Sequence, residues 1–322
     1  MDVFDFLGFL KKINLYYHIK PFIPRWFQIF LRRLLIHQKK AYYRKTWPIN
    51  EKAAKLPDGW KGWPDNKKFA LVLTHDVESS KGQEKCVKLA ELETELGFKS
   101  TFNFVPKRYY VSPEVRNYLV ENGFEVGVHG LYHDGKLYAS RRIFEKRAVE
   151  INKYLKEWGA VGFRAPSMHH NLDWNCMLNI EYDASTFDTD PFEPQSDGIN
   201  TIFPVKIENY STRTCDFKCD GYIELPYTLP QDFALFIILR EKNIDTWGKK
   251  LDWIVEKGGM ALLNTHPDYM NFGDGPDKMD EYPCDYYRDI LETIKQNYKD
   301  EYWHVLPKEM ARYWSRDRLT DG

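Results

Sequence analysis

The sequence predicts an α/β protein built around a parallel β-sheet, arranged either as a (β/α) barrel or as a doubly wound sheet. From residue 69 onward, short apolar runs alternate with longer stretches of helical periodicity, and this alternation is typical of parallel sheets. Four of the apolar runs are followed closely by an ionisable side chain. Because the carboxyl ends of barrel strands meet at one mouth, these side chains predict a site there.

The candidate elements follow one another in a regular order. Apolar runs predict seven strands, at residues 69–73, 100–105, 124–128, 161–164, 182–186, 222–225 and 260–263, and helical spacing predicts helices at 82–96, 113–121, 141–158, 244–256 and 285–297. Glycines at 97, 123 and 159 support three of the helix ends, because glycine readily adopts the left-handed conformation that closes a helix. No internal repeat is present.

Composition is that of a globular chain. The 322 residues are 43 % hydrophobic and 29 % charged, which excludes disordered and collagen-like architectures. The aromatic content of 16 % fits a carbohydrate-handling protein, and it fits a large core equally well. The five cysteines have irregular spacings and predict no disulfide framework, which fits a reducing cytoplasm. Cys215 and Cys219 could form half of a zinc site, but we favour a loop with two ordinary thiols.

Residues 1–50 form a separate basic arm. Residues 1–45 hold ten Lys or Arg against two Asp, so this segment carries +8 and the remainder −9. A basic arm on an acidic body suggests an anionic surface as partner, and without a second basic cluster in the body we expect no nucleic-acid role. Because neither a secretory signal nor a spanning run is visible, the expected location is cytoplasmic, with peripheral contact at the inner face of the membrane as one possibility. The oligomeric state is not predictable.

A helix is predicted after Pro24, with Phe27, Phe30, Leu31 and Leu34 along one side and basic residues that include Arg25, Arg32 and Lys39 on the other. One interpretation lays this helix on an anionic membrane and exposes those three basic residues. The alternative packs the four apolar side chains on the barrel. The following residues, 51–67, are rich in Pro, Gly and Trp and predict a linker or a wrapped arm.

Two carboxylates stand two residues apart at the end of the first predicted strand. If the strand continues, Asp76 and Glu78 point to the same side. One of them can then bind a metal while the other takes a proton from water. A solvated loop is the competing interpretation of this pair.

A pair of histidines follows the third predicted strand. His129 and His133 are separated by three residues, and Gly130 favours a loop over a helix. Two imidazoles and one carboxylate form a hydrolytic zinc set that leaves a position open for water. The histidines alone are moderate evidence, but a carboxylate pair at another strand end strengthens it.

Two further strand ends carry a cation and a histidine. Arg164 follows the fourth strand, where its guanidinium could keep a neighbouring carboxylate ionised. His266 follows the seventh strand and could protonate a leaving amine as a general acid. Their ordinary interpretations are a surface arginine and a structural histidine.

Taken together, these motifs resemble the polysaccharide deacetylase (NodB-homology) family over residues 66–310. Residues 74–78, Thr-His-Asp-Val-Glu, are similar to the Asp-Val-Asp variants of the family's first motif, and residues 125–133 look like its metal-binding motif. Residues 164–166 match its Arg-x-Pro motif, and residues 263–266 match its Leu-x-x-His motif. The order of the motifs agrees with the order of the predicted strands.

The resemblance implies a distorted seven-stranded (β/α) barrel over residues 68–312, preceded by the helical arm and followed by a tail at 313–322. It implies one divalent ion, zinc or a similar metal, bound by Glu78, His129 and His133, and a catalytic set of Asp76 as base, Arg164 orienting it and His266 as acid. Val77 and Glu78 depart from the common pattern, so the roles of Asp76 and Glu78 could be exchanged.

The activity implied is removal of an N-acetyl group from an amino sugar or glycan precursor, as in glycan biosynthesis. Two alternatives stay open: hydrolysis of another non-peptide C–N bond on the same barrel, and a non-catalytic carbohydrate-binding relative. Acidic residues that could orient His266 are Asp188, Asp190, Glu224 and Asp268, and His169 and His170 could touch substrate.

Overall fold

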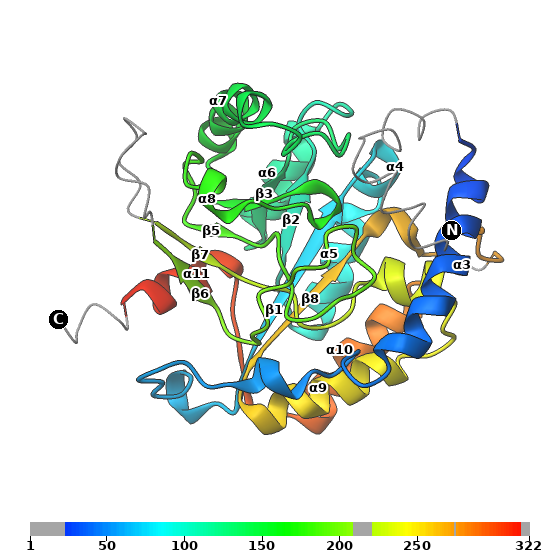
Figure 1. Ribbon diagram of the computed structural model, residues 1–322, viewed down its shortest axis with the longest axis vertical. Coiled ribbons are helices and arrows are strands. Elements are labelled where there is room, and N and C mark those ends of the chain that lie inside the picture. Colours follow the sequence, from blue (N-terminus) through cyan, green and yellow to red (C-terminus); the bar gives the residue numbers. More distant parts are fainter. Residues whose placement is uncertain (1–22, 209–220, 274, 317–322) are drawn as a thin grey trace.

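Eight parallel strands curl into an open barrel, and seven of them are the strands that the sequence predicts (Figure 1). The computed structural model describes residues 23–208, 221–273 and 275–316. The seven predicted strands are β1 (Phe69–Val77), β2 (Thr101–Phe104), β3 (Glu125–His129), β4 (Gly162–Arg164), β5 (Tyr182–Asp183), β7 (Tyr222–Glu224) and β8 (Met260–Thr265). The prediction of a distorted (β/α) barrel is confirmed.

Strand β1 lies at the centre of the sheet. One of its edges pairs with β8 along Ala70–His75, and the other pairs first with β11 (Tyr302–His304) and then with β2. All nine residues of β1 are buried, which explains its nearly continuous apolar sequence. The strand extends past that apolar run because its polar residues find buried partners, such as the Asn264 side chain for Thr74.

The barrel is distorted where its two ends meet. An isolated parallel bridge between Leu229 and Leu263 joins the chain after β7 to β8, and the amides of Thr228 and Leu229 both donate to the carbonyl of Leu262. On the outer side of β7, β6 (Val205–Ile207) adds an antiparallel strand. Neither β6 nor β11 was predicted, because both are three residues long and only half-buried.

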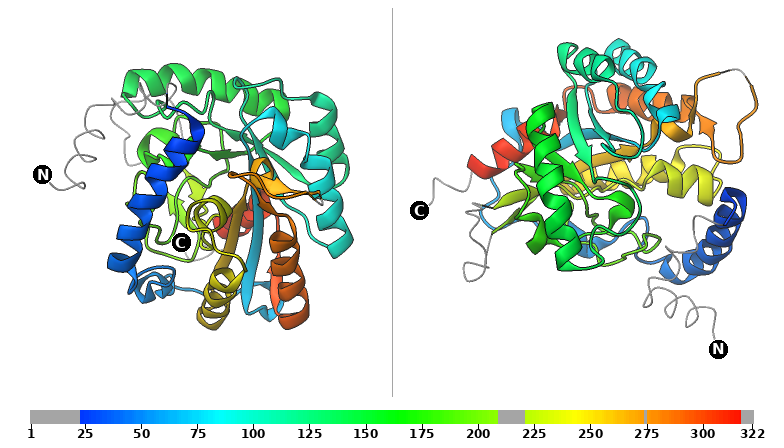
Figure 2. Two further views of the ribbon diagram at one scale, coloured as in Figure 1. Left: turned by 90° about the vertical axis from the view of Figure 1, so that its right-hand side faces the viewer. Right: turned by 90° about the horizontal axis from the view of Figure 1, so that it is seen from above.

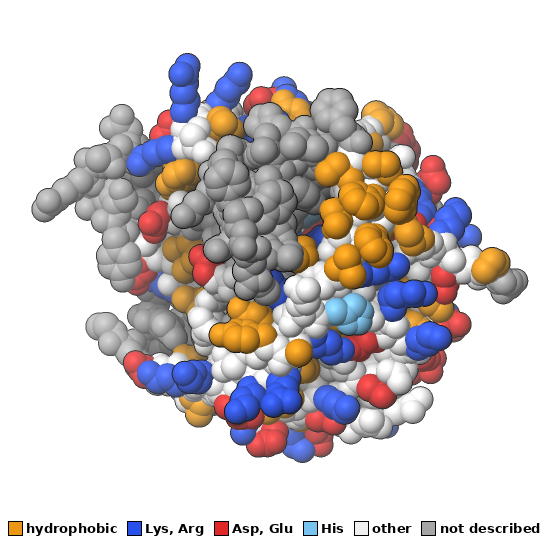
Figure 3. All heavy atoms as spheres, turned by 45° about the vertical axis from the view of Figure 1, so that its right-hand side comes forward, with side chains coloured by type: hydrophobic (Ala, Val, Ile, Leu, Met, Phe, Trp, Pro, Cys, Tyr) orange, Lys and Arg blue, Asp and Glu red, His pale blue; other side chains and the backbone are white. Residues whose placement is uncertain are grey.

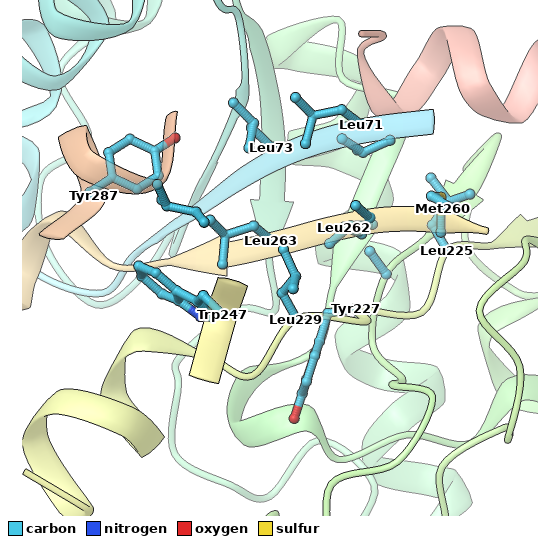
Figure 4. Close-up of a cluster of buried hydrophobic side chains, with 14 of the residues drawn as sticks. Leu71, Leu73, Leu225, Tyr227, Leu229, Trp247, Met260, Leu262, Leu263 and Tyr287 are labelled. Atoms are coloured by element: carbon cyan, nitrogen blue, oxygen red, sulfur yellow. The ribbon is translucent and has the colours of Figure 1, made fainter. Parts of the chain in front are cut away.

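Helices cover the outside of the sheet (Figure 2). They are α4 (Ser80–Gln83), α5 (Cys86–Leu96), α6 (Pro113–Glu121), α7 (Arg141–Trp158), α9 (Asp245–Lys257), α10 (Asp285–Asn297) and α11 (Pro307–Arg316), and a π-helical segment, η5, spans Phe233–Ile238. The side chains of Ser112 and Ser140 cap the amino ends of α6 and α7, because each accepts a hydrogen bond from a backbone amide of its helix. Beneath them, buried side chains of β1 and β8 pack with Trp247 of α9 and Tyr287 of α10 (Figure 4).

The arm helix α3 (Arg25–Tyr43) lies against the barrel beside η5 (Figures 1 and 2). Its buried residues are Ile29 and Ile36. One prediction had four apolar side chains of this helix packed on the barrel. These side chains are instead 37–50 % exposed: Phe27, Phe30, Leu31 and Leu34. The helix therefore packs on the barrel, but through a different face.

The orientation expected for a membrane-bound α3, with Arg25, Arg32 and Lys39 exposed, holds only for Arg25, because Arg32 and Lys39 are half-buried. Lys39 donates to the carbonyl of Pro191 at 2.9 Å, Arg33 donates to that of Ile237, and Arg32 lies over the ring of Phe233. Arg25 is exposed, and its guanidinium donates to the hydroxyl of Tyr269. The basic side of α3 thus turns toward the barrel and the apolar side turns outward.

Residues 51–67 pack along the barrel and do not extend into solvent as a separate linker. Ala53 and Trp63 are buried, and the indole of Trp63 donates to the carbonyl of Gly258, which ends α9. Among the described residues, no helix is both long and apolar enough to cross a membrane.

Candidate active site

Five of the six predicted site residues line one cavity at the carboxyl ends of the strands. The cavity has a volume of about 600 Å³. Its lining includes Asp76, Glu78, His129, His133 and His266. The sixth residue, Arg164, is completely buried behind Asp76.

Glu78, His129 and His133 form a group that could hold a metal ion. One ligand atom from each of the three lies within 4.8 Å of the others. The Nε2 atom of His133 is 2.9 Å from Glu78 Oε1, yet it is buried without a hydrogen bond among the described residues. A buried nitrogen left without a hydrogen bond beside a carboxylate fits a metal ligand, and the donor set suits zinc.

The loop after β3 brings the two imidazoles together. Gly130 and His133 both have positive φ values, 60° and 54°, so the chain turns back on itself as the glycine predicted. A side chain at position 130 would collide with Pro166. On the other ring, His129 Nδ1 lies 3.1 Å from the carbonyl of Arg164, an interaction that leaves Nε2 facing the cavity. Burial lowers the pKa of His129 to about 4, so the ring is neutral at physiological pH.

Asp76 is held by two amides. Asn103 Nδ2 donates to one carboxylate oxygen at 3.0 Å, and Asn264 Nδ2 donates to the other at 2.9 Å. Although burial opposes the charge, His129, Arg164 and His266 lower the pKa of Asp76 to about 2. The carboxylate is therefore ionised at physiological pH.

The expected hydrogen bond between Arg164 and Asp76 is absent. Their closest nitrogen and oxygen atoms are 3.7 Å apart, and the guanidinium makes no hydrogen bond among the described residues. Arg164 acts on Asp76 through its charge, while the two asparagines fix the position of the carboxylate. Neither asparagine was predicted as a site residue, although Asn103 lies within a predicted strand and Asn264 directly follows another.

His266 faces Asp76 across the cavity and is held from behind by Asp232. Its Nε2 atom is 3.9 Å from Asp76 Oδ2, and its Nδ1 atom is 2.7 Å from Asp232 Oδ1. Asp232 also accepts hydrogen bonds from the backbone amide of His266 and from Tyr282. Burial disfavours the imidazolium, but Asp232 outweighs this and raises the pKa of His266 to about 10.

Asp232 is therefore the residue that orients His266, and none of the four proposed acidic residues does so. Asp188 instead pairs with Lys250, Asp190 accepts from Tyr227, Glu224 accepts from Thr186, and Asp268 accepts from Ser79. Asp232 lies seven residues beyond the predicted strand, next to η5, so no strand-end pattern marks it.

Glu78 is positioned by Tyr269, which was not predicted as a site residue, and by Asp268, which was expected in a different role. The hydroxyl of Tyr269 donates to Glu78 Oε2 at 2.9 Å, and the Glu78 amide donates to Asp268 at 2.8 Å. Asp268 approaches so closely that a side chain in place of Gly82 would overlap it. Although burial opposes it, His133 lowers the pKa of Glu78 well below its usual value.

Other candidates lie elsewhere. His169 and His170 are not among the residues that line the main cavity. Cys215 and Cys219 lie outside the described residues. Cys86, Cys176 and Cys284 are buried, and none of them lines the main cavity.

No protein-family model and no curated protein matches the sequence. Solved structures are similar in fold. A protein from Mycobacterium smegmatis described as a polysaccharide deacetylase is 17 % identical, with a TM-score of 0.61 over 82 % of this chain and 96 % of its own. One from Pseudomonas aeruginosa PAO1 with the same description is 15 % identical, with a TM-score of 0.57 over 79 % and 93 %.

A third similar structure is that of Puue allantoinase. It is 14 % identical, with a TM-score of 0.58 over 83 % of this chain and 97 % of its own. Identities this low establish a shared fold alone. Two of these structures are described as polysaccharide deacetylases, and this is the family that the motifs resemble. The chain thus has the fold of the polysaccharide deacetylases, and the resemblance seen in its motifs extends to its three-dimensional structure.

Proposed function

We propose that this protein is a metal-dependent hydrolase that removes N-acetyl groups from an amino sugar or glycan precursor. The observation that carries the proposal is the convergence of Glu78, His129 and His133 within 4.8 Å, beside the facing pair Asp76 and His266. Each of the five comes from a strand end or the loop after it, and a hydrolytic site of this type needs all three functions: metal ligand, base and acid.

The chemistry can be assigned to named atoms. A divalent ion held by the three ligands, zinc by its preference for this donor set, would polarise the amide carbonyl and lower the pKa of water. Asp76, kept ionised by its partners, would accept a proton from the attacking water. His266 Nε2, protonated through its pairing with Asp232, would donate a proton to the leaving amine.

The two alternatives make different demands on these residues. Hydrolysis of another C–N bond is compatible with the fold, since Puue allantoinase shares it. An amidase that works without metal would have no use for the convergence of Glu78, His129 and His133 within 4.8 Å. A purely binding relative would need neither the Asp76–His266 pair nor the Asp232 carboxylate behind it.

The test combines metal content with product analysis. Purified protein should carry close to one zinc or similar ion per chain. It should release acetate from N-acetylated sugars, and it should neither open the ring of cyclic amides nor release ammonia from them. A chelator should abolish acetate release, and added metal should restore it. Acetate release that is unaffected by complete metal removal would refute the proposal.

We also propose that the protein contacts the cytoplasmic face of an anionic membrane through the outer side of α3. The exposed fractions of Trp26, Phe30 and Leu34 on this helix are 58 %, 48 % and 50 %, and hydrophobic side chains gather on this side of the molecule (Figure 3). Lysines at positions 11, 12 and 20 precede the helix in the sequence. Aromatic and aliphatic side chains flanked by basic residues favour an anionic bilayer interface.

Sedimentation with vesicles of phosphatidylglycerol and phosphatidylcholine tests this contact. Wild-type protein should sediment at low salt, and the triple substitution of Trp26, Phe30 and Leu34 by serine should weaken binding at least tenfold. A matched control replaces Tyr110, Val120 and Val149, which are exposed elsewhere, by serine and should bind as the wild type does. Equal binding by both triple variants would overturn the proposal.

A further inference from the structure

The basic side of α3 forms one wall of the active-site cavity. Arg25, Gln28 and Arg32 line it, at the spacing of three and four residues that places side chains on one helix face. Both guanidiniums lie near the ring of Phe233, with the central carbon of Arg25 5.6 Å and that of Arg32 5.0 Å from its centre. An arm outside the predicted barrel therefore contributes directly to the substrate site.

A third guanidinium, that of Arg108, lines the same cavity from the loop after β2. Neither Arg32 nor Arg108 forms an ion pair within 4.0 Å with the described residues, whereas the nearby Lys81 pairs with Glu281 at 2.8 Å. Arg25 donates to the hydroxyl of Tyr269, a neutral partner, at 3.3 Å. Within the part of the chain that the structure describes, none of these three cations in the cavity wall forms an ion pair with a carboxylate.

The carboxylates in the wall are largely engaged elsewhere. Asp134 is held by both terminal nitrogens of Arg147, and Asp268 by the Glu78 amide. Glu193 accepts hydrogen bonds from Tyr227 and Gln231, and burial raises its pKa to about 7. Asp76 and Glu78 belong to the catalytic and metal set. Asp280, the remaining carboxylate of the wall, interacts with Arg25 through its charge. A bound divalent cation would add two further positive charges to this wall.

We propose that the substrate carries a phosphate or diphosphate ester next to its N-acetylated sugar, and that Arg25, Arg32 and Arg108 bind this group. The inference rests on the proposed deacetylase function and narrows its substrate class. Guanidinium groups match phosphate oxygens with paired hydrogen bonds, and a diphosphate has enough charge and acceptors for several of them. Such an ester could come from a nucleotide-linked sugar or from a lipid-linked sugar.

Matched substrates test the proposal. Acetate release is measured for methyl N-acetylglucosaminide, which is neutral, for UDP-N-acetylglucosamine, and for N-acetylglucosamine diphosphate on a short polyprenyl chain. The wild-type kcat/KM should be at least tenfold higher for one of the two diphosphates than for the neutral glycoside, and the preferred diphosphate identifies the source. Arg32→Gln and Arg108→Gln should each reduce this ratio about tenfold, mainly through KM. Arg142→Gln, which alters an exposed arginine of α7, should leave the ratio unchanged.

A binding measurement separates this inference from the deacetylase proposal. Pyrophosphate is titrated calorimetrically into chelator-treated protein, so that binding to a metal cannot contribute. Binding that Arg32→Gln weakens about tenfold would support the anion site even if none of the sugars released acetate. Acetate release that is equally efficient for neutral and diphosphate sugars and insensitive to Arg32→Gln would overturn the anion site and leave the deacetylase in place. Equal pyrophosphate binding by wild type and Arg32→Gln would also overturn it.

Discussion

The imidazole of His266 lies between two carboxylates, with Nδ1 2.7 Å from Asp232 and Nε2 3.9 Å from Asp76. The short contact fixes the ring, and the long one leaves room in the cavity on the side of Asp76. Because Asp232 is buried and accepts three more hydrogen bonds, from Tyr282 and from the amides of His266 and Phe233, it can sustain a charged imidazolium. This relationship leads to the first prediction.

Replacing Asp232 by asparagine should shift the alkaline limb of the pH–rate profile to lower pH. His266 must be protonated to act as an acid, so activity is lost as pH rises through its pKa of about 10. Without the Asp232 charge this pKa should fall toward the usual value of ~6.5, and activity near pH 8 should drop by roughly tenfold or more. The control Tyr282→Phe removes only one hydrogen bond to Asp232. An unshifted limb in Asp232→Asn would exclude His266 as the acid.

Replacing His133 by alanine should remove bound metal and activity together. Two ligands would remain of the three that converge, too few for tight zinc binding. Zinc per chain, measured by elemental analysis after dialysis, should fall well below that of the wild type. His170→Ala serves as the control because His170 does not line the cavity. Full metal retention in His133→Ala would exclude this residue as a ligand.

Replacing Asp76 by asparagine should reduce kcat by about 10²-fold or more while leaving metal bound. The variant loses the base. In the wild type, the side-chain amides of Asn103 and Asn264 donate to the Asp76 carboxylate, and in the variant the new amide nitrogen would face one of these two donors. Metal content and acetate release are measured on the same sample. If metal is lost instead, the roles of Asp76 and Glu78 are exchanged.

Removing the hydroxyl of Tyr269 should weaken metal binding without abolishing it. Tyr269 donates to Glu78 Oε2, and partners of this type typically contribute about 10- to 100-fold to metal affinity. Competition with a chromophoric chelator should show this change for Tyr269→Phe. The control Tyr110→Phe changes an exposed ring and should bind metal as the wild type does. Equal metal affinity in both variants would show that Tyr269 does not support Glu78 as a metal ligand.

Lys250→Met should lower the free energy of unfolding by about 3–5 kcal/mol. The buried Lys250 ammonium donates to Asp188 and to the carbonyl of Pro48, so the substitution leaves a buried carboxylate without its cation. Denaturant unfolding is the measurement. Lys257→Met, which breaks only exposed ion pairs, should leave the free energy of unfolding nearly unchanged. Adding Asp188→Leu to Lys250→Met should recover part of the loss, and no recovery would argue against the buried charge as the cause.

The sequence by itself determined seven of the barrel strands, most of the helices and the positions of the residues that meet in the cavity. These features are local: an apolar run, a glycine at a helix end and an ionisable residue just beyond a strand are all readable within a few neighbours. The order of strands in a parallel barrel then places their carboxyl ends together, so Asp76, His129 and His266 could be predicted to meet without coordinates.

Only the tertiary structure decided which residues hold that set in place and how the arm lies. Asp232 and His266 are 34 positions apart, and Tyr269 and Glu78 are 191 apart, so no local pattern connects them. For α3, helical periodicity identified its two faces but not which one would turn inward. The barrel offers Phe233, Tyr269 and backbone carbonyls to the basic side, while Ile29 and Ile36 on that same side supply the buried apolar contacts. Those partners exist only once the barrel has folded, and for that reason the orientation of α3 could not be predicted from its own sequence.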